Sequence, residues 1–229
     1  MMTTDNNADM KPIVAVVFDL DGVLIDSEQV WDEARRELAR ELGRSWRPEA
    51  TRAMMGMSST EWSRYMHERL AVPLQPADIS RKVVERLRAL YDQELPLMPG
   101  ARAAVRRLAA RWPLGLASSS NRELIDHALE LAGLAKEFQV TISSDEVAAG
   151  KPRPDVYLEA CRRLGAPPPG CVAVEDSGNG IRSARAAGMR VMAIPNRALP
   201  PEPEALAAAD LVLDRLAGLT AAAVAGLAG

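Results

Sequence analysis

Short apolar runs alternate with helical patterns along the second half of the chain. Each run is short enough for one strand and apolar enough to be buried on both faces. These runs are 113–118, 138–143, 171–176, 190–195 and 210–214. The segments between them carry apolar residues at three- and four-residue steps, which is typical of helices. Strand and helix in alternation predict a parallel sheet with helices on both faces. An earlier run at 13–18 predicts the first strand of that sheet.

The stretch between 27 and 95 breaks the alternation. It is rich in helix formers with apolar positions at helical spacing, and no strand is convincing there. The three predicted helical segments are 30–43, 59–71 and 76–94. We therefore expect an α/β protein with a Rossmann-like parallel sheet core, residues 1–26 and 96–229, and an inserted α-helical cap domain, residues 27–95. Its hinges are expected at 25–27 and 95–100, where prolines and a glycine punctuate the chain.

Composition narrows the class of protein. The chain has 229 residues and a formal charge of −3, with basic residues spread along its length, so nucleic acid is not the expected partner. No apolar run is long enough to cross a membrane. The start of the chain is polar and lacks the apolar middle of a signal peptide. Cys161 and Cys171 form no metal-binding pattern and are expected to be reduced thiols. We expect a cytoplasmic monomer that acts on a small molecule.

Polar groups gather where the first predicted strand ends. Asp19 and Asp21 are two residues apart and can project to the same side of the chain. Carboxylates this close repel each other, and one pKa would rise unless a cation lies between them. Mg²⁺, which binds a few carboxylates plus water, fits this arrangement. Gly22 permits the tight turn that follows.

Three later segments add complementary groups at expected strand ends. Ser118 to Asn121 offer hydroxyls, backbone N–H groups and a helix cap, and helix N-termini attract anions. Lys151 precedes a proline, which holds it in an extended conformation. Glu175 and Asp176 end a strand and supply the further carboxylates that a metal ion needs. Each feature alone is more often a turn, a cap or a surface residue, and the ordered combination is what indicates a phosphate site.

This combination resembles the haloacid dehalogenase superfamily of phosphotransferases. The segment DLDGVLIDS, residues 19–27, is similar to its first motif, Ser118 to its second, Lys151 to its third and the Glu-Asp pair at 175 to its fourth. The resemblance covers residues 13 to about 215. The helical insert is similar to the small cap of the subgroup that contains beta-phosphoglucomutase and many sugar phosphatases.

The resemblance implies a role for each motif residue. Asp19 would be the nucleophile that forms an aspartyl-phosphate, and Asp21 the general acid and base. The phosphoryl oxygens would be held by Ser118, Ser119, Asn121 and Lys151. Mg²⁺ would be bound by Asp19, by the backbone carbonyl of Asp21, by Asp176, and by Glu175 directly or through water.

Two positions in the cap help to distinguish a phosphatase from a phosphosugar mutase. The resemblance to the mutase leads us to look for a histidine at position 31, where the chain has Trp31. It also leads us to look for a phosphate-holding arginine at position 59, where the chain has Ser59 with Arg52 and Arg64 nearby. We therefore expect a Mg²⁺-dependent phosphomonoesterase that hydrolyses small sugar phosphates. The alternatives are a phosphosugar mutase and, from another class, a non-catalytic binding or regulatory protein, although none of the motif residues is missing.

The substrate-facing residues of the cap stay open at this stage. Trp31, Trp62 and the methionines at 54, 55 and 57 form either an adaptable wall around a sugar or the hydrophobic core of the cap itself. Met57 and Ser58, which follow Gly56, are the best candidates to face the substrate. The segment DSEQVWDEA, residues 26–34, is similar to a group that hydrolyses hexose, deoxyhexose and hexitol phosphates.

Overall fold

A parallel sheet forms the centre of the molecule. The structure is a computed structural model and describes residues 12–54, 57–196 and 200–228. The strands are β1 (Ala15–Phe18), β2 (Leu114–Ser118), β3 (Val140–Ser143), β4 (Cys171–Glu175), β5 (Arg190–Ala193) and β6 (Leu211–Val212). They lie in the order β3-β2-β1-β4-β5-β6, and every pair is parallel. The predicted Rossmann-like core is confirmed, with each strand inside the run that predicted it.

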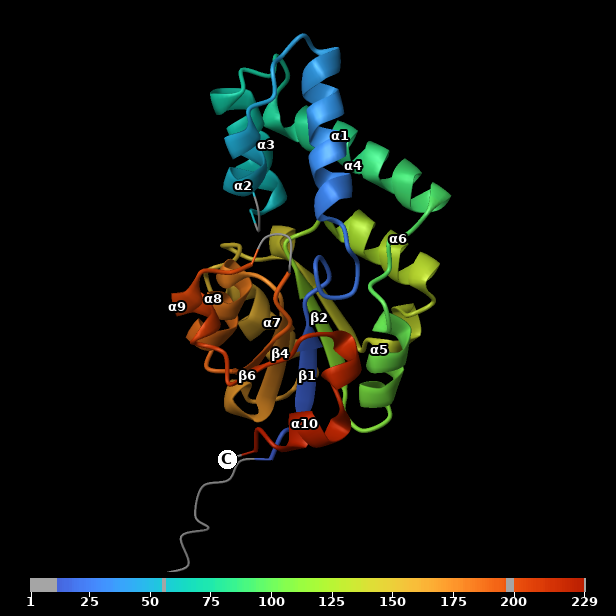
Figure 1. The fold of residues 1–229 in the computed structure, drawn as a ribbon, viewed down its shortest axis with the longest axis vertical. Helices are drawn as coiled ribbons and strands as arrows, with labels where there is room; N and C mark the ends of the chain where they lie inside the picture. Colours follow the sequence, from blue (N-terminus) through green and yellow to red (C-terminus); the bar gives the residue numbers. More distant parts are fainter. Residues whose placement is uncertain (1–11, 55–56, 197–199, 229) are drawn as a thin grey trace, which may run out of the picture.

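Helices cover both faces of this sheet (Figure 1). The core helices are α5 (Ala101–Ala109), α6 (Arg122–Ala132), α7 (Asp155–Leu164), α8 (Gly178–Ala186), α9 (Pro203–Leu206) and α10 (Ala221–Ala225). Alternate residues of β1 point to opposite faces. Val16 and Phe18 belong to the apolar cluster that includes α5 and α6, whereas Ala15 and Val17 belong to the cluster that includes α7 and α8. Burial on both faces explains why these strands are continuously apolar.

The inserted segment is helical, as predicted. Its helices are α1 (Glu28–Glu41), α2 (Pro48–Met54), α3 (Ser59–Arg69) and α4 (Pro76–Gln93), and they lie above the sheet end in Figure 1. The described residues of 27–95 contain no strand. Pro76 occupies the first turn of α4, where its missing N–H costs nothing. The short helix α2 was not predicted, because it buries only Ala50 and Met54 and has no clear apolar period.

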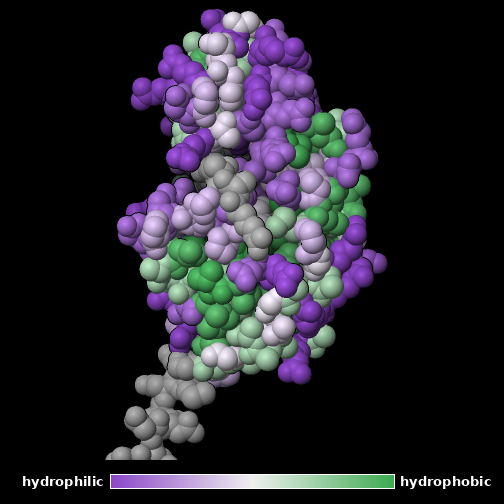
Figure 2. All heavy atoms as spheres, viewed as in Figure 1, coloured by the Kyte–Doolittle hydropathy of each residue, from purple (hydrophilic) through white to green (hydrophobic). Residues whose placement is uncertain are grey.

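Two chain crossings join the cap helices to the core. They run side by side: the N–H of Asp26 donates to the carbonyl of Pro96 over 2.8 Å, and that of Met98 donates to the carbonyl of Leu24 over 2.9 Å. Ile25 also forms an antiparallel bridge with Leu97. Asp26, Pro96 and Met98 belong to the two predicted hinge segments, Leu24 lies just before the first, and hinge motion stays a prediction. The space-filling view shows a cap surface that is mostly polar above a core with more apolar residues (Figure 2).

Packing joins the cap and the core. The apolar cluster over one face of the sheet continues into the cap, where it includes Leu38, Trp62 and Leu87. The cap therefore has no separate hydrophobic core among the described residues, and the division into two domains stays a prediction. Cys161 and Cys171 are both buried free thiols. No helix of the described chain has the length and apolarity needed to cross a membrane.

Candidate active site

A buried group of charges lies beyond the carboxyl ends of β1 and β4. Asp19 follows β1 and is 6% exposed, and its N–H donates to the carbonyl of Val174 over 2.9 Å. Lys151 donates from Nζ to Asp19 Oδ1 over 2.7 Å and to Glu175 Oε1 over 2.6 Å. The sheet order reverses between β1 and β4, because the strands that follow them extend in opposite directions. Ligands of open parallel sheets bind at such a point.

Glu175 anchors this group. Its Oε1 accepts hydrogen bonds from Lys151 and, over 2.7 Å, from the hydroxyl of Tyr157. Its Oε2 accepts from the backbone N–H groups of Asp176 and Ser177 and from the hydroxyl of Ser177. A Cβ added at Gly180 would lie 1.9 Å from the Glu175 carboxyl carbon, so only glycine fits there. Tyr157 and Gly180 were missed in the sequence, where nothing links them to Glu175 before the chain folds.

The carboxylates of Asp19, Glu175 and Asp176 fit a metal ion. One oxygen from each lies within 4.8 Å of the others, and all three residues are buried. Burial raises the pKa of Asp19 to about 8. The charge of Lys151 acts to lower this pKa, and the carboxylates of Glu175 and Asp21 act to raise it. Burial first, and then Glu175 and Asp19, raise the pKa of Asp176. Without a cation these acids tend to take up protons, and a divalent cation bound among them would keep the carboxylates ionised.

Lys151 holds its charge in this group. Burial alone would lower the pKa of its ammonium, but the facing carboxylates of Asp19 and Glu175 raise it above the ordinary value. Its side chain is 3% exposed, and a buried ion pair with this geometry is weakly screened by salt. The structure therefore joins the three side chains predicted to bind the metal ion and Lys151 in one cluster. Asp21 was predicted to bind through its backbone carbonyl, and its side chain has other partners.

The carboxylate of Asp21 is held by four donors. Its Oδ1 accepts from Ser27 Oγ over 2.5 Å and from Trp31 Nε1 over 3.1 Å. Its Oδ2 accepts from Ser120 Oγ over 2.7 Å and from Ser118 Oγ over 3.3 Å. Ser118 ends β2 and Ser120 follows it, Ser27 belongs to the crossing into the cap, and Trp31 lies on α1. The orientation of this carboxylate thus depends on the core and the cap together.

The turn after Asp21 requires a glycine. Gly22 has a φ of 81°, and an added Cβ would lie 2.0 Å from Asp176 Oδ2. Its N–H donates to the carbonyl of Ile25 over 2.7 Å, which closes the turn. The turn that was expected from the sequence is therefore present, and the missing side chain also leaves space for a metal-site carboxylate.

Residues 118–121, at the end of β2 and just after it, do not all face the cavity. Ser119 and Ser120 line the pocket described below, whereas Ser118 is fully buried and its Oγ accepts from the N–H of Ser120 over 3.0 Å. Asn121 does not line the pocket. Its Nδ2 donates to Asp145 Oδ2 over 3.2 Å, at a point where Ser59 of α3 also donates to Asp145. A phosphate-binding role of Asn121 stays a prediction.

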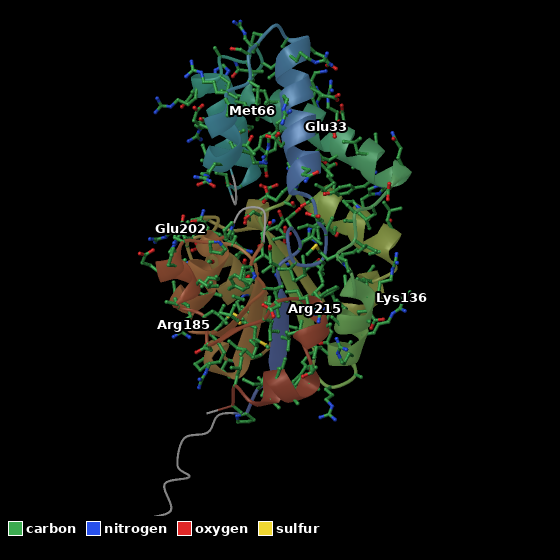
Figure 3. The ribbon with its side chains drawn as sticks, in the orientation of Figure 1. Glu33, Met66, Lys136, Arg185, Glu202 and Arg215 are labelled. Atoms are coloured by element: carbon green, nitrogen blue, oxygen red, sulfur yellow. The ribbon has the colours of Figure 1, made fainter. Side chains whose placement is uncertain are left out.

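A cavity of about 700 Å³ connects these groups to the cap. Its lining includes Asp19, Asp21, Ser119, Ser120, Lys151 and Asp176 from the core, and Glu28, Trp31, Arg35, Arg52, Met54, Met57 and Trp62 from the cap. Glu202 and Arg182, which pair over 3.4 Å, lie at its core edge, and Glu202 is labelled in Figure 3.

The cap residues that were expected to face a substrate do not all line the cavity. Met57 lines the cavity, whereas Ser58 begins α3 in a capping box with Glu61. Trp31 and Trp62 both line the cavity and belong to the apolar core, so the two interpretations of these rings are compatible. Met55 and Gly56 lie outside the described residues. Arg35 was not singled out, because a charged run on a helix gives no sign of which arginine is buried.

A larger hollow of about 1310 Å³ lies along another side of α1. Asp26, Asp32, Glu33 and Arg36 are among its lining residues, but Asp19, Asp21 and Lys151 are not. It therefore lacks the groups that the strand ends bring together. The smaller cavity is the candidate active site.

Several known proteins are similar to this chain in sequence and in fold. Hexitol phosphatase B of Escherichia coli (strain K12) is 33% identical over 217 residues, which covers 92% of this chain and 96% of that protein. The phosphorylated carbohydrates phosphatase of Thermotoga maritima is 32% identical over 176 residues, 76% of this chain and 82% of that protein. CbbY from Rhodobacter sphaeroides, solved with phosphate and also with xylulose-(1,5)bisphosphate, is 31% identical, with a TM-score of 0.82 over 93% of this chain and 99% of CbbY.

The match to a family model is consistent with these relatives. The model for haloacid dehalogenase-like hydrolases matches residues 13–188, which contain every motif residue from Asp19 to Asp176. The motif resemblance, the parallel sheet and the buried strand-end charges agree with this match. The chain belongs to the haloacid dehalogenase-like hydrolases.

Proposed function

We propose that this hydrolase is a Mg²⁺-dependent phosphomonoesterase that acts on small sugar phosphates through an aspartyl-phosphate. The observation that carries the proposal is the juxtaposition of Asp19, Lys151 and the Asp176 carboxylate beside Asp21 in one cavity. Hexitol phosphatase B and the Thermotoga phosphatase, whose names specify phosphorylated carbohydrates, support the substrate class.

The proposed reaction begins with Asp19. One carboxylate oxygen of Asp19 attacks phosphorus, and the bond from phosphorus to the leaving oxygen breaks. Asp21, in its protonated form, donates a proton to that oxygen, and the alcohol leaves. Lys151 positions the Asp19 carboxylate over 2.7 Å, and its charge opposes the charge that builds on the phosphoryl oxygens.

The second half of the reaction regenerates the carboxylate. Asp21 accepts a proton from water, the water oxygen attacks phosphorus, and the bond between phosphorus and Asp19 breaks to release phosphate. Mg²⁺, bound by Asp19, Asp176 and Glu175 directly or through water, would supply positive charge to the phosphoryl group. Both Glu175 oxygens already accept hydrogen bonds from the protein, which favours the water-mediated contact.

The test is phosphate release from a panel of phosphate esters with Mg²⁺ and with EDTA. We expect release from hexose, pentose or hexitol phosphates that EDTA abolishes and added Mg²⁺ restores. A ³²P-labelled ester, quenched in acid, should leave label on the protein that hydroxylamine removes, as it does from acyl phosphates. Release that EDTA does not change, or an absence of such label under burst conditions, would contradict the proposed mechanism.

A phosphosugar mutase is the second candidate. The observation that favours it is the presence of a cap arginine, Arg35, in the cavity, although the mutase resemblance placed an arginine at position 59. Ser59 instead donates a hydrogen bond to Asp145. Exchange of glucose 1-phosphate and glucose 6-phosphate that requires glucose 1,6-bisphosphate, without net phosphate release, would favour the mutase.

A further inference from the structure

Arg35 is a buried arginine that forms no ion pair with any residue the structure describes. It lies on α1 and is 8% exposed, its Nε has no hydrogen-bond partner, and no ion pair among the described residues includes it. The next residue, Arg36, lies in the opposite situation, because it is largely exposed and pairs with Asp32. Arg86 of α4 likewise pairs with acids of α1. Burial of an unpaired charge is costly, so its presence requires an explanation.

Two tryptophans hold the guanidinium of Arg35. Its Cζ lies 4.6 Å from the centroid of the Trp31 ring and 5.0 Å from that of the Trp62 ring. The two rings themselves meet edge to face at 5.7 Å between centroids. Contact with the ring faces uses none of the N–H groups of a guanidinium as hydrogen-bond donors, so those that reach the cavity can donate to a ligand. These groups suit a carboxylate or a phosphate, which accept two parallel hydrogen bonds.

The surroundings of Arg35 keep it charged. Burial lowers its pKa to about 10, and the carboxylates of Glu28, Asp21 and Asp32 act in the opposite direction. None of the three is close enough to form an ion pair with it. A guanidinium with this pKa is protonated near neutral pH and can bind an anion.

Arg35 lines the same cavity as Asp19, Asp21 and Lys151. A second cap arginine, Arg52 of α2, lines it at an exposed position. The core end of the cavity therefore carries the groups for the phosphoryl that is transferred, and the cap end carries cations that this transfer does not use. The predicted arginine position, Ser59, does not line the cavity, so these cations come from other helices.

We propose that Arg35 selects phosphate esters that carry a second anionic group at the end remote from the transferred phosphoryl. The shared chemistry of that group is a carboxylate or a second phosphate, which the guanidinium would bind beside the two indoles. This inference rests on the proposed phosphatase function and specifies its substrate class. Arg52, at the rim, would add attraction of longer range.

The test compares three esters that differ in the charge at carbon 1: glucitol 6-phosphate, an open chain that is neutral there, gluconate 6-phosphate, an open chain with a carboxylate, and glucose 1,6-bisphosphate, a pyranose with a phosphate. We expect kcat/KM for one or both of the doubly anionic esters to exceed that for glucitol 6-phosphate by about tenfold or more. Comparison of the two distinguishes the carboxylate from the phosphate.

The variant Arg35→Gln should remove this preference, so that the ratio of kcat/KM for a doubly anionic ester to kcat/KM for glucitol 6-phosphate falls to about one. The control variant Arg36→Gln should retain the parental ratio. A parental preference for glucitol 6-phosphate would overturn the inference. An equal decrease for all three esters in Arg35→Gln would do the same, because it would assign Arg35 to support of Trp31 and Asp21.

Binding provides a second measurement that does not depend on turnover. In the Asp19→Asn variant, calorimetry should give a Kd for gluconate 6-phosphate or glucose 1,6-bisphosphate about tenfold lower than for glucitol 6-phosphate. Equal Kd values would contradict the role of Arg35. Failure of the phosphatase proposal is a distinct result: the native chain with Mg²⁺ would release phosphate from none of the three esters or the wider panel.

Discussion

The two ends of the cavity are built in different ways. At the core end, every oxygen of Glu175 and Asp21 accepts a hydrogen bond, and Lys151 connects two buried acids. At the cap end, the lining residues are held by aromatic contacts and apolar packing, and Arg35 forms no ion pair with a described residue. A saturated polar network admits few rearrangements without a large energetic cost. Methionines and stacked rings admit many more.

This difference indicates a division of roles. The core end can hold reacting groups in one geometry, which phosphoryl transfer needs. The cap end can adapt to the remainder of a substrate. Trp31 belongs to both parts, because its ring packs in the cap and its N–H contacts Asp21. Changes at the core end should therefore affect all substrates, and changes at the cap end should affect substrates selectively.

The largest effect is expected from Asp19→Asn. Asparagine keeps the shape of the side chain but removes the nucleophile, so kcat should fall by at least about 10³-fold for every ester. Far-UV circular dichroism should show an unchanged fold. The matched control is Asp26→Asn, an exposed acid in the crossing into the cap, which should keep kcat within about twofold of the parental value. Substantial turnover by Asp19→Asn would contradict the covalent mechanism.

Lys151→Ala should have the next largest effect, on stability as well as activity. It leaves Asp19 and Glu175 without their buried cation, and loss of one partner of a buried pair costs about 3 kcal/mol in the free energy of unfolding. Urea denaturation in EDTA measures this change. Lys136→Ala is the control, since Lys136 is exposed and points away from the core (Figure 3). A loss below about 1 kcal/mol for Lys151→Ala would mean that the acids take up protons instead.

Gly180→Ala should reduce stability by about 2 kcal/mol, because the new methyl overlaps the fully buried Glu175 carboxyl. Gly178→Ala provides the comparison at the same end of α8. Its Cβ would lie 2.7 Å from the end of the Glu202 side chain, which can move, and 3.3 Å from Ala205 Cβ and from Arg182 Nη2. Thermal unfolding of the two variants should therefore differ. Equal melting temperatures would show that Glu175 can be displaced without cost.

The smallest effect is expected from Trp31→Phe. Phenylalanine keeps a ring beside Arg35 but removes the hydrogen bond to Asp21 Oδ1, one of four that this carboxylate accepts. We expect kcat to fall about fivefold with a smaller change in KM. Trp46→Phe is a matched control, because the Trp46 indole donates to Thr51, and Trp46 does not line the cavity. A change in KM alone would assign Trp31 to substrate binding only.

Much of the core could be predicted from the sequence. Continuous apolar runs between helical patterns determine a parallel sheet, and the carboxyl ends of parallel strands lie at one edge. Asp19, Lys151, Glu175 and Asp176 were therefore expected together, and the structure brings them together. Helix α2 was missed, because a short helix with two buried residues has too weak a period.

The sequence by itself determined the order of strands and helices, the helical insert and the charged groups at the strand ends, since each of these follows from local periodicity and from the geometry of parallel strands. The tertiary structure decided the partners of Asp21, the contact of Asn121 with Asp145 rather than the cavity, and the burial of Arg35 against two tryptophans. These contacts join helices and loops that are distant in the chain. Such contacts depend on how the cap packs over the sheet, and no local pattern of residues encodes that packing.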